Sequence, residues 1–308
     1  MGLTRSVSSD NVDPTSPDRD TSRLRVPDGL AWLAQSQNGA AWLDDLPSLV
    51  AEIADSWDLE IGDPFAGSQV SWVAPARRAR RDVVVKVQWP HPESEHEAAA
   101  LEAWAGDGAV QLLAHDAQHH ALLLERCRPG THLADAVESD AVAVFVDLLP
   151  RLWKEARAPF RSLTDESARW ASTLATRWEA AGRPCERRLV AAATSFLQEL
   201  SVTQGEQVLV HQDLHADNVL AAERRPWLVI DPKPIAGERE VAVAPVVRSF
   251  ELGHSPSEVV GRLDRLCREL HLDRERARGW TIAQTMAWSF DSSFSARHYD
   301  TVRWLLDT

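Results

Sequence analysis

The chain has 308 residues and a formal net charge of −13, from 33 Lys and Arg against 46 Asp and Glu. Its hydrophobic content of 44% and charged content of 26% are ordinary for a soluble globular protein, and its length suffices for two lobes with a core each. The acidic balance argues against nucleic acid as a partner, because phosphate backbones are bound by Lys and Arg. It is compatible with a cationic substrate and equally with simple solubility.

The three cysteines are Cys127, Cys185 and Cys267, and no two of them form a Cys-x-x-Cys pair. That usage fits a reducing compartment without a disulfide framework. No apolar run approaches the length of a membrane span, and the N-terminus lacks a basic-then-apolar signal pattern. We therefore expect a cytoplasmic protein with no membrane partner, either a monomer or a homodimer.

Short strands dominate the first part of the chain, after a tail over residues 1–24 that is too polar to order itself. A helix is predicted over residues 40–57, where apolar residues recur at spacings of three and four. The further elements predicted before residue 128 are strands over 69–73, 82–89, 110–114 and 121–124, a hairpin turn over 74–81 and a helix over 92–105. Residues 25–127 thus form a strand-rich N-lobe.

Helical periodicity prevails after the Pro129-Gly130 pair, which is typical of a connector. The predicted helices span 141–156, 166–180, 185–200, 256–270 and 274–306, interrupted by short strands over 208–210, 218–221 and 227–230. A strand-rich N-lobe and a helical C-lobe over 128–308 predict an α+β fold. Its form is bilobal and protein-kinase-like, with an antiparallel sheet in the N-lobe.

The strongest chemical signal is the run His-Gln-Asp213-Leu-His-Ala-Asp-Asn218, which is followed after a strand by Asp231-Pro-Lys. Phosphoryl transfer needs a carboxylate to orient and accept the proton of the attacking hydroxyl, and hard oxygen ligands for Mg²⁺. Asp213 fits the first role, and Asn218 and Asp231 fit the second. A polar loop between two strands is the alternative. The spacing of the whole set is typical of a kinase catalytic loop and its metal-binding Asp.

A second signal is Lys86, which lies within a run of valines. A lysine in a buried strand is costly unless it is paired. Kinases use such a lysine at the α- and β-phosphates, oriented by a glutamate on the next helix. Glu97 is the first candidate for that glutamate and Glu95 the second. The alternative is a solvent-facing lysine on an alternating strand.

Two segments are weaker candidates for nucleotide contacts. The turn around Gly67 and Ser68 could lay backbone N–H groups over phosphates, although one glycine does not make a glycine-rich loop. The segment with Glu125 and Cys127 leads into the connector, where the backbone of a kinase-like fold meets adenine. For a cationic substrate the acidic candidates are Glu238, Glu240 and Asp291, which a solvated acidic face explains equally well.

On these motifs the chain resembles the aminoglycoside and hydroxyurea antibiotic-resistance kinases, typified by streptomycin 6-phosphotransferase. The segments that carry the similarity are residues 70–75, 84–87, 91–98, 106–113, 121–127, 211–218 and 228–233. The resemblance implies an aminoglycoside-phosphotransferase fold, ATP or GTP with Mg²⁺, and phosphorylation of a substrate hydroxyl. By position it also implies Asp213 as base, Asn218 and Asp231 as metal ligands, and Lys86 with Glu97 at the phosphates.

Departures from related patterns limit what the acceptor can be. The metal Asp is followed by Pro-Lys, and no long activation segment ending in Ala-Pro-Glu follows, so a small-molecule acceptor is expected rather than a protein. The family typically has His-Gly-Asp; here Gln212 holds the middle position, where it is tolerated if it points outward, and Pro234 follows the Asp-Pro-Lys run.

The function expected first is transfer of the γ-phosphate of ATP to a streptomycin-like aminoglycoside or aminocyclitol. The alternatives are another small alcohol, a sugar or hydroxyurea as acceptor. A catalytically silent nucleotide-binding module is the alternative of another class. The intact set of Lys86, Asp213, Asn218 and Asp231 argues against it, because a silent module would have no need of all four.

Overall fold

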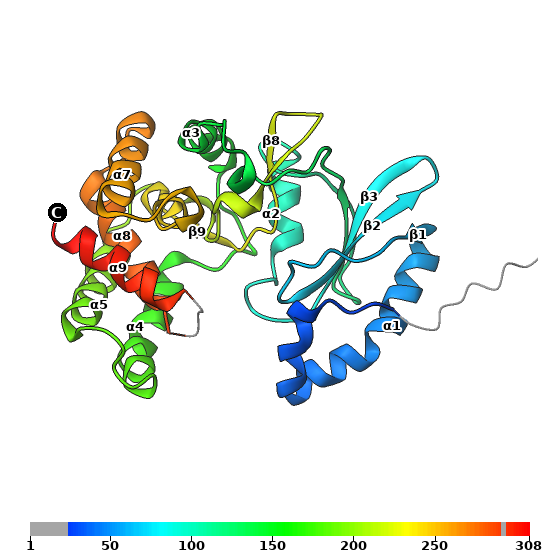
Figure 1. Ribbon diagram of the computed structural model, residues 1–308, viewed down its shortest axis with the longest axis horizontal. Helices are drawn as coiled ribbons and strands as arrows, with labels where there is room; N and C mark the ends of the chain where they lie inside the picture. The colour runs from blue at the N-terminus through cyan, green and yellow to red at the C-terminus, as the bar shows by residue number, and fades with distance from the viewer. Residues whose placement is uncertain (1–23, 291–293) are drawn as a thin grey trace, which may run out of the picture.

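The computed structural model describes residues 24–290 and 294–308, so the predicted tail falls almost wholly outside the described residues. A region built on a β-sheet lies beside a region built mainly of helices (Figure 1). The two halves follow each other in the chain, which confirms the predicted bilobal α+β fold. No helix of the described residues has the length and apolar character that a bilayer crossing needs.

The N-lobe is a five-stranded antiparallel sheet with the strand order β1-β2-β3-β5-β4. Its strands are β1 (Leu59–Ile61), β2 (Ser71–Arg78), β3 (Arg81–Gln88), β4 (Leu112–Asp116) and β5 (Ala121–Glu125). One face is covered by the 3-10 helix η1 (Asp28–Gln35) and by α1 (Gln37–Trp57), which pack on Trp72, Val85 and Leu123. Leu122 and Leu124 point to the other face, as the two-residue period of a strand requires, and join the core that contains α2 (Glu97–Trp104).

Two predicted boundaries in this lobe are wrong. The hairpin turn was expected over residues 74–81, but β2 continues to Arg78 and pairs with β3 down to Arg78↔Arg81. Its arginines are exposed at the strand end, and the turn itself is confined to Ala79 and Arg80, with Ala79 at a φ of 52°. The helix expected from residue 92 begins at Glu97, because the proline-rich stretch before it forms turns.

The C-lobe is helical, with two short antiparallel ladders at the side that faces the sheet. The ladders are β6 with β9 and β7 with β8. The C-lobe elements are η2 (Leu133–Asp135), α3 (Ala141–Leu152), α4 (Leu163–Ala180), α5 (Arg187–Ser201), β6 (Val208–His211), η3 (Ala216–Asn218), β7 (Val219–Ala221), β8 (Trp227–Val229), β9 (Pro234–Gly237), η4 (Arg239–Val243), α6 (Ala244–Val247), η5 (Phe250–Leu252), α7 (Pro256–Leu270), α8 (Arg274–Ala287) and α9 (Ser295–Leu306).

The single helix predicted over 274–306 is two helices, α8 and α9. A continuous helix of that length would extend about 50 Å, longer than a lobe of this size can cover. The chain turns after Ala287 instead, and α9 packs back against α7 and α8. This leaves α8 as the central helix of the lobe, with Thr281, Gln284 and Thr285 fully buried. Polar side chains therefore lie inside the lobe, beneath the ladders.

The two lobes are joined by specific contacts. Trp104 of α2 donates from its indole nitrogen to the carbonyl oxygen of Leu152 at 2.8 Å. The backbone N–H of Val110 donates to the carbonyl of Val229 at 3.0 Å, which ties the chain before β4 to the end of β8. These contacts place β3 across from the β7–β8 hairpin.

Candidate active site

The predicted catalytic loop lies between β6 and β7, and its backbone is fixed by hydrogen bonds on both sides. The Nδ1 atom of His211 accepts from the N–H of Asp213 at 3.1 Å, and its Nε2 donates to the carbonyl of Ile230 at 3.1 Å. Asn218 donates from its side-chain nitrogen to the carbonyl of Asp213 at 2.8 Å. The loop is therefore anchored both to itself and to the strand that precedes Asp231.

Asp213 carries a partly buried carboxylate between two cations. The Nζ atom of Lys233 lies 2.9 Å from Oδ2, and the Nη2 atom of Arg248 lies 3.9 Å from Oδ1. Burial opposes ionisation, but Lys233, His215 and Arg248 outweigh it and hold the pKa of Asp213 below its ordinary value. The group is therefore an anion that can orient a hydroxyl and accept its proton.

Lys86 on β3 makes the predicted contact with Glu97, the first residue of α2. The Nζ atom lies 2.9 Å from Oε1 and 2.6 Å from Oε2 of Glu97, and Gln88 donates to the same carboxylate at 2.7 Å. The second candidate, Glu95, has an exposed side chain and pairs weakly with His96 at 3.9 Å. The first-choice pairing is confirmed, and its role at nucleotide phosphates stays a prediction.

The same ammonium also contacts Asp231 across the lobes. Burial disfavours the charge on Lys86, yet Asp231 and Glu97 together raise the pKa of Lys86 above its ordinary value. Burial also raises the pKa of Glu97 to about 7, whereas Lys86 holds the pKa of Asp231 well below its usual range. The ammonium of Lys86 is thus paired with both carboxylates.

The two predicted metal ligands lie at one end of the β7–β8 hairpin. Val219 pairs with Val229, and the N–H of Ile230 donates to the carbonyl of Asn218 at 3.0 Å, so Asn218 and Asp231 flank the last rung of the ladder. The side chain of Asp231 is 44% exposed, so part of its carboxylate remains accessible beside the contact with Lys86. One carboxylate and one amide oxygen are ligands that Mg²⁺ prefers, so the donor set fits that ion.

The weaker nucleotide candidates lie where the chain enters and leaves the sheet. Trp32 of η1 donates to the carbonyl of Gln69 at 2.8 Å, and a Cβ at Gly67 would meet nothing within 4 Å, so the loop that precedes β2 is supported from one side and open at Gly67. The hydroxyl of Ser68 accepts from the N–H of Ser71 at 3.2 Å. That side chain stabilises the loop itself.

At the end of β5 the side chain of Glu125 is already occupied, because it accepts from Arg224 at 2.8 and 2.9 Å. Burial raises the pKa of Cys127 to about 12, so its thiol stays protonated. Among the described residues no backbone hydrogen bond uses the N–H or carbonyl of Cys127. Any contact with a base would therefore be made by that backbone.

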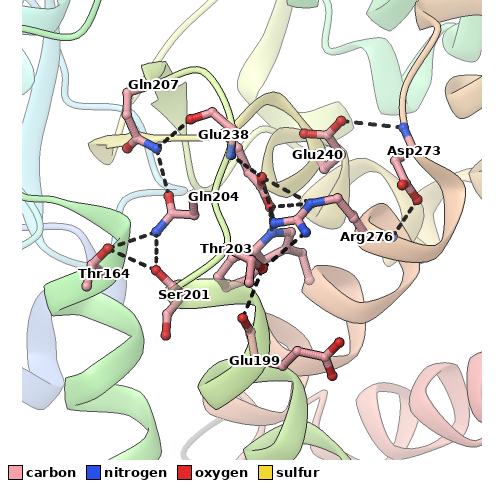
Figure 2. A network of polar contacts seen from close by, with 12 residues as sticks. Thr164, Glu199, Ser201, Thr203, Gln204, Gln207, Glu238, Glu240, Asp273 and Arg276 are labelled. Atoms are coloured by element: carbon pink, nitrogen blue, oxygen red, sulfur yellow. Dashed lines mark hydrogen bonds and ion pairs between the residues drawn. The ribbon is translucent and has the colours of Figure 1, made fainter.

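Glu238, one of the acidic residues expected to bind substrate, lies away from the predicted catalytic loop. Glu238 follows β9, and the pairing of Val208 with Gly237 and of His211 with Pro234 sets it at the end of the ladder opposite Asp213. Its buried carboxylate accepts from Arg276 at 2.8 and 2.9 Å (Figure 2). It also accepts from the indole of Trp280.

Glu240, another acidic candidate, contacts the residue that caps the start of α8. Glu240 accepts from the backbone N–H of Asp273 at 3.4 Å, in the same network as Glu238 (Figure 2). Asp291 lies outside the described residues. The structure therefore places Glu238 and Glu240 in one network within the C-lobe, and any contact of either residue with a substrate stays a prediction.

Gln212 also departs from expectation. Its side chain does not point outward, since the residue is 1% exposed. Its N–H donates to the carbonyl of Lys233 at 3.1 Å, and its own carbonyl accepts from Gln284 of α8 at 3.1 Å. Pro234 begins β9, a strand position that proline tolerates. The two unusual residues therefore lie inside the C-lobe and support the loop.

Sequence reasoning missed the residues that surround Asp213 from the C-lobe. Arg248 and Lys233 both lie against the indole of Trp288, at 4.8 and 5.2 Å from its ring centre. A single arginine directly after the apolar run 241–247 was the available signal.

The bilobal fold, the lysine paired with a helix glutamate and the carboxylates of Asp213 and Asp231 near the junction of the lobes are those expected of a kinase-like phosphotransferase. The family described as aminoglycoside/hydroxyurea antibiotic resistance kinase matches residues 58–293. The chain belongs to this family, as the sequence predicted, and is a phosphotransferase that acts on a hydroxyl group.

Relatives support the family assignment, and solved structures share the fold. The chain is 34% identical over 290 residues to streptomycin 6-kinase of Streptomyces griseus, covering 90% of this chain and 94% of that protein. It is 40% identical over 276 residues to hydroxyurea phosphotransferase of Kitasatospora aureofaciens, covering 85% and 78%. A choline kinase of Streptococcus pneumoniae has a TM-score of 0.62 at 14% identity, covering 85% and 99%. An aminoglycoside phosphotransferase solved with ADP and hygromycin B has a TM-score of 0.60 at 15% identity, covering 83% and 97%.

Proposed function

We propose that this chain transfers the γ-phosphate of ATP to a hydroxyl of a streptomycin-like aminoglycoside or aminocyclitol, in the cytoplasm. The observation that carries the proposal is the chain of contacts from Glu97 through Lys86 to Asp231, which joins the two lobes beside Asp213. The nucleotide would lie between the lobes, with residues 25–127 as its lobe and 128–308 as the lobe of the acceptor.

Each group has a stated task in the proposed mechanism. Lys86 grips the α- and β-phosphates, and Glu97 orients it. Asn218 and Asp231 would hold Mg²⁺, and the ion would supply positive charge that offsets the charge of the phosphates. Asp213 orients the acceptor hydroxyl and accepts its proton as the phosphoryl group is transferred.

A cationic acceptor is supported by two carboxylates beside the catalytic loop. The Nδ1 atom of His215 lies 2.9 Å from Glu251 and 3.9 Å from Asp217. Burial and the nearby Glu251 raise the pKa of Asp217 above its ordinary value, while the positive charge of His215 opposes this shift. An ammonium or guanidinium group of an aminocyclitol would pair with the side chain of Asp217, which is 51% exposed.

Hydroxyurea is the second candidate acceptor, because a relative at 40% identity is named a hydroxyurea phosphotransferase.

The proposed function is tested by a coupled nucleotide-consumption assay with a panel of aminoglycosides, hydroxyurea and simple sugars, run with ATP and with GTP. We expect aminoglycoside-dependent turnover that Asp213→Ala abolishes. Turnover with hydroxyurea alone would replace the first candidate by the second, and turnover that survives Asp213→Ala would overturn the catalytic assignment. Nucleotide binding without turnover on any acceptor would favour a silent module.

A further inference from the structure

Arg248 is a buried cation with few hydrogen bonds. Its side chain is 7% exposed. The Nη1 atom donates to Oε1 of Gln284 at 2.6 Å, and within residues 24–290 and 294–308 this is the single hydrogen bond that the guanidinium makes. Burying a guanidinium costs free energy unless its charge is compensated. Among the described residues, Asp213 is the acid that lies nearest to this buried charge.

The position of Arg248 mirrors that of Lys233 across the catalytic carboxylate. Lys233 contacts Oδ2 of Asp213 at 2.9 Å, and Arg248 faces Oδ1 at 3.9 Å. Both cations lie over the indole of Trp288, at 5.2 and 4.8 Å from its ring centre. Because the face of an indole attracts cations, one ring holds both of them in place.

Gln284 connects the same arginine to the backbone of the catalytic loop. Its Oε1 accepts from Arg248, and its Nε2 donates at 3.1 Å to the carbonyl of Gln212, the residue before Asp213. A separation of 3.9 Å is too long for a hydrogen bond, so Arg248 acts on the carboxylate by its charge and through the shared amide.

We propose that Arg248, supported by Trp288 and Gln284, is a positioning residue that fixes the orientation of the Asp213 carboxylate. Lys233 occupies Oδ2, and Oδ1 accepts no hydrogen bond among the described residues, so Oδ1 is the oxygen left for the acceptor hydroxyl. A carboxylate held this way delivers the hydroxyl in line with the phosphoryl donor. The inference rests on the proposed phosphotransferase mechanism and deepens it.

Arg262 offers a matched control in the same lobe. It is as buried as Arg248, at 5% exposure, but it donates to the backbone carbonyls of Val247, Leu252 and Gly253. Its role is therefore to satisfy backbone groups. The experiment compares Arg248→Met and Arg248→Lys with Arg262→Met. The quantities measured are kcat, both KM values, the ratio of phosphorylated acceptor to nucleotide consumed, and Tm.

We expect Arg248→Met to lower kcat by about 100-fold, since a misplaced reacting group costs on this order, while the nucleotide KM changes by less than about threefold. The ratio of product to nucleotide consumed should fall, and Arg248→Lys should restore part of kcat. Arg262→Met should lower Tm, while the folded enzyme keeps its kcat and its ratio of phosphorylated acceptor to nucleotide consumed. Wild-type kcat and ratio in folded Arg248→Met would overturn the proposal.

Two additions keep the result decisive. If Arg248→Met does not fold, Trp288→Leu removes the indole beneath Arg248 without leaving a buried charge unpaired. A wild-type kcat and a wild-type ratio of phosphorylated acceptor to nucleotide consumed in that variant would equally overturn the proposal.

Crystal structures of the Arg248 and Arg262 variants with a nucleotide analogue need no acceptor. We expect the carboxylate of Asp213 to be displaced in the former and unmoved in the latter. An unmoved carboxylate in both refutes the positioning role, whereas absent turnover in the wild type refutes the proposed acceptor only.

Discussion

The ammonium of Lys86 lies between the two carboxylate oxygens of Glu97, 2.9 Å from one and 2.6 Å from the other, and the side chains of both residues are almost fully buried. The same ammonium contacts Asp231 of the other lobe. Two carboxylates are thus arranged around one lysine at the junction of the lobes. Removing any one of these three charges changes the electrostatic interaction between the other two.

Lys86→Met is expected to lower the free energy of unfolding by about 3–5 kcal/mol, the usual cost of stranding a buried charge. The double variant Lys86→Met/Glu97→Gln should lose less than the sum of the two single variants, because the second change removes the stranded carboxylate. Urea unfolding of the four proteins measures this coupling. Strictly additive losses would show that the pair does not interact as the distances indicate.

Removal of divalent cations is expected to abolish turnover, because the phosphates would keep their full charge. An excess of EDTA followed by readdition of Mg²⁺ tests this directly. Asp231→Asn should raise the Mg²⁺ concentration needed for half-maximal rate, since an anionic ligand becomes neutral. Asp217→Asn is the matched control, one residue from Asn218, and should leave the Mg²⁺ dependence unchanged. An equal change in both variants would argue against Asp231 as a ligand.

Glu238→Ala should destabilise the protein by about 3–5 kcal/mol, because Arg276 would lose the partner that neutralises it. We expect the pattern of acceptors used to stay unchanged in the folded protein, since Glu238 is buried at the far end of the β6–β9 ladder from Asp213. Glu240→Ala provides the control and should cost less than about 1 kcal/mol. Thermal unfolding together with the acceptor panel distinguishes a structural role of Glu238 from a role in acceptor binding. A shift in acceptor preference without loss of stability would contradict this prediction.

Acid should destabilise the protein through His211. Burial lowers the pKa of His211 to about 4 from 6.5, and its Nδ1 is engaged as an acceptor. Below pH 6.5 the unfolded state binds a proton that the folded state excludes, so stability falls as the pH drops from 6.5 to 4. The loss attributable to this group reaches about 3 kcal/mol at about 1.36 kcal/mol per pKa unit.

His211→Gln should flatten this pH dependence, measured as the free energy of unfolding between pH 7.5 and 4.5. His115→Gln replaces an exposed histidine and serves as the control. If the slope for His211→Gln equals that of the wild type, another buried group causes the acid sensitivity. His298, whose pKa burial also lowers to about 4, would be the next residue to substitute.

The features that the sequence predicted correctly are local ones. The pairing of Lys86 with Glu97 follows from a lysine in an apolar strand and a glutamate at the start of the next helix. The strands β3 and β5 and the helix α7 were predicted within a residue or two, because their apolar periodicity is strong. The boundary errors fall where polar residues end a strand or prolines precede a helix, since neither pattern fixes the residue at which hydrogen bonding begins.

The amino-acid sequence by itself determined the class of chemistry, because Asp213, Asn218 and Asp231 lie in one short segment whose spacing suffices to bring them together. Only the tertiary structure decided which side chains surround that segment. Arg248, Gln284 and Trp288 approach Asp213 from helices distant in the sequence, and Glu238 is turned away by the direction of β9. No local periodicity encodes how separate helices pack, so these contacts exist only once the C-lobe has folded around α8.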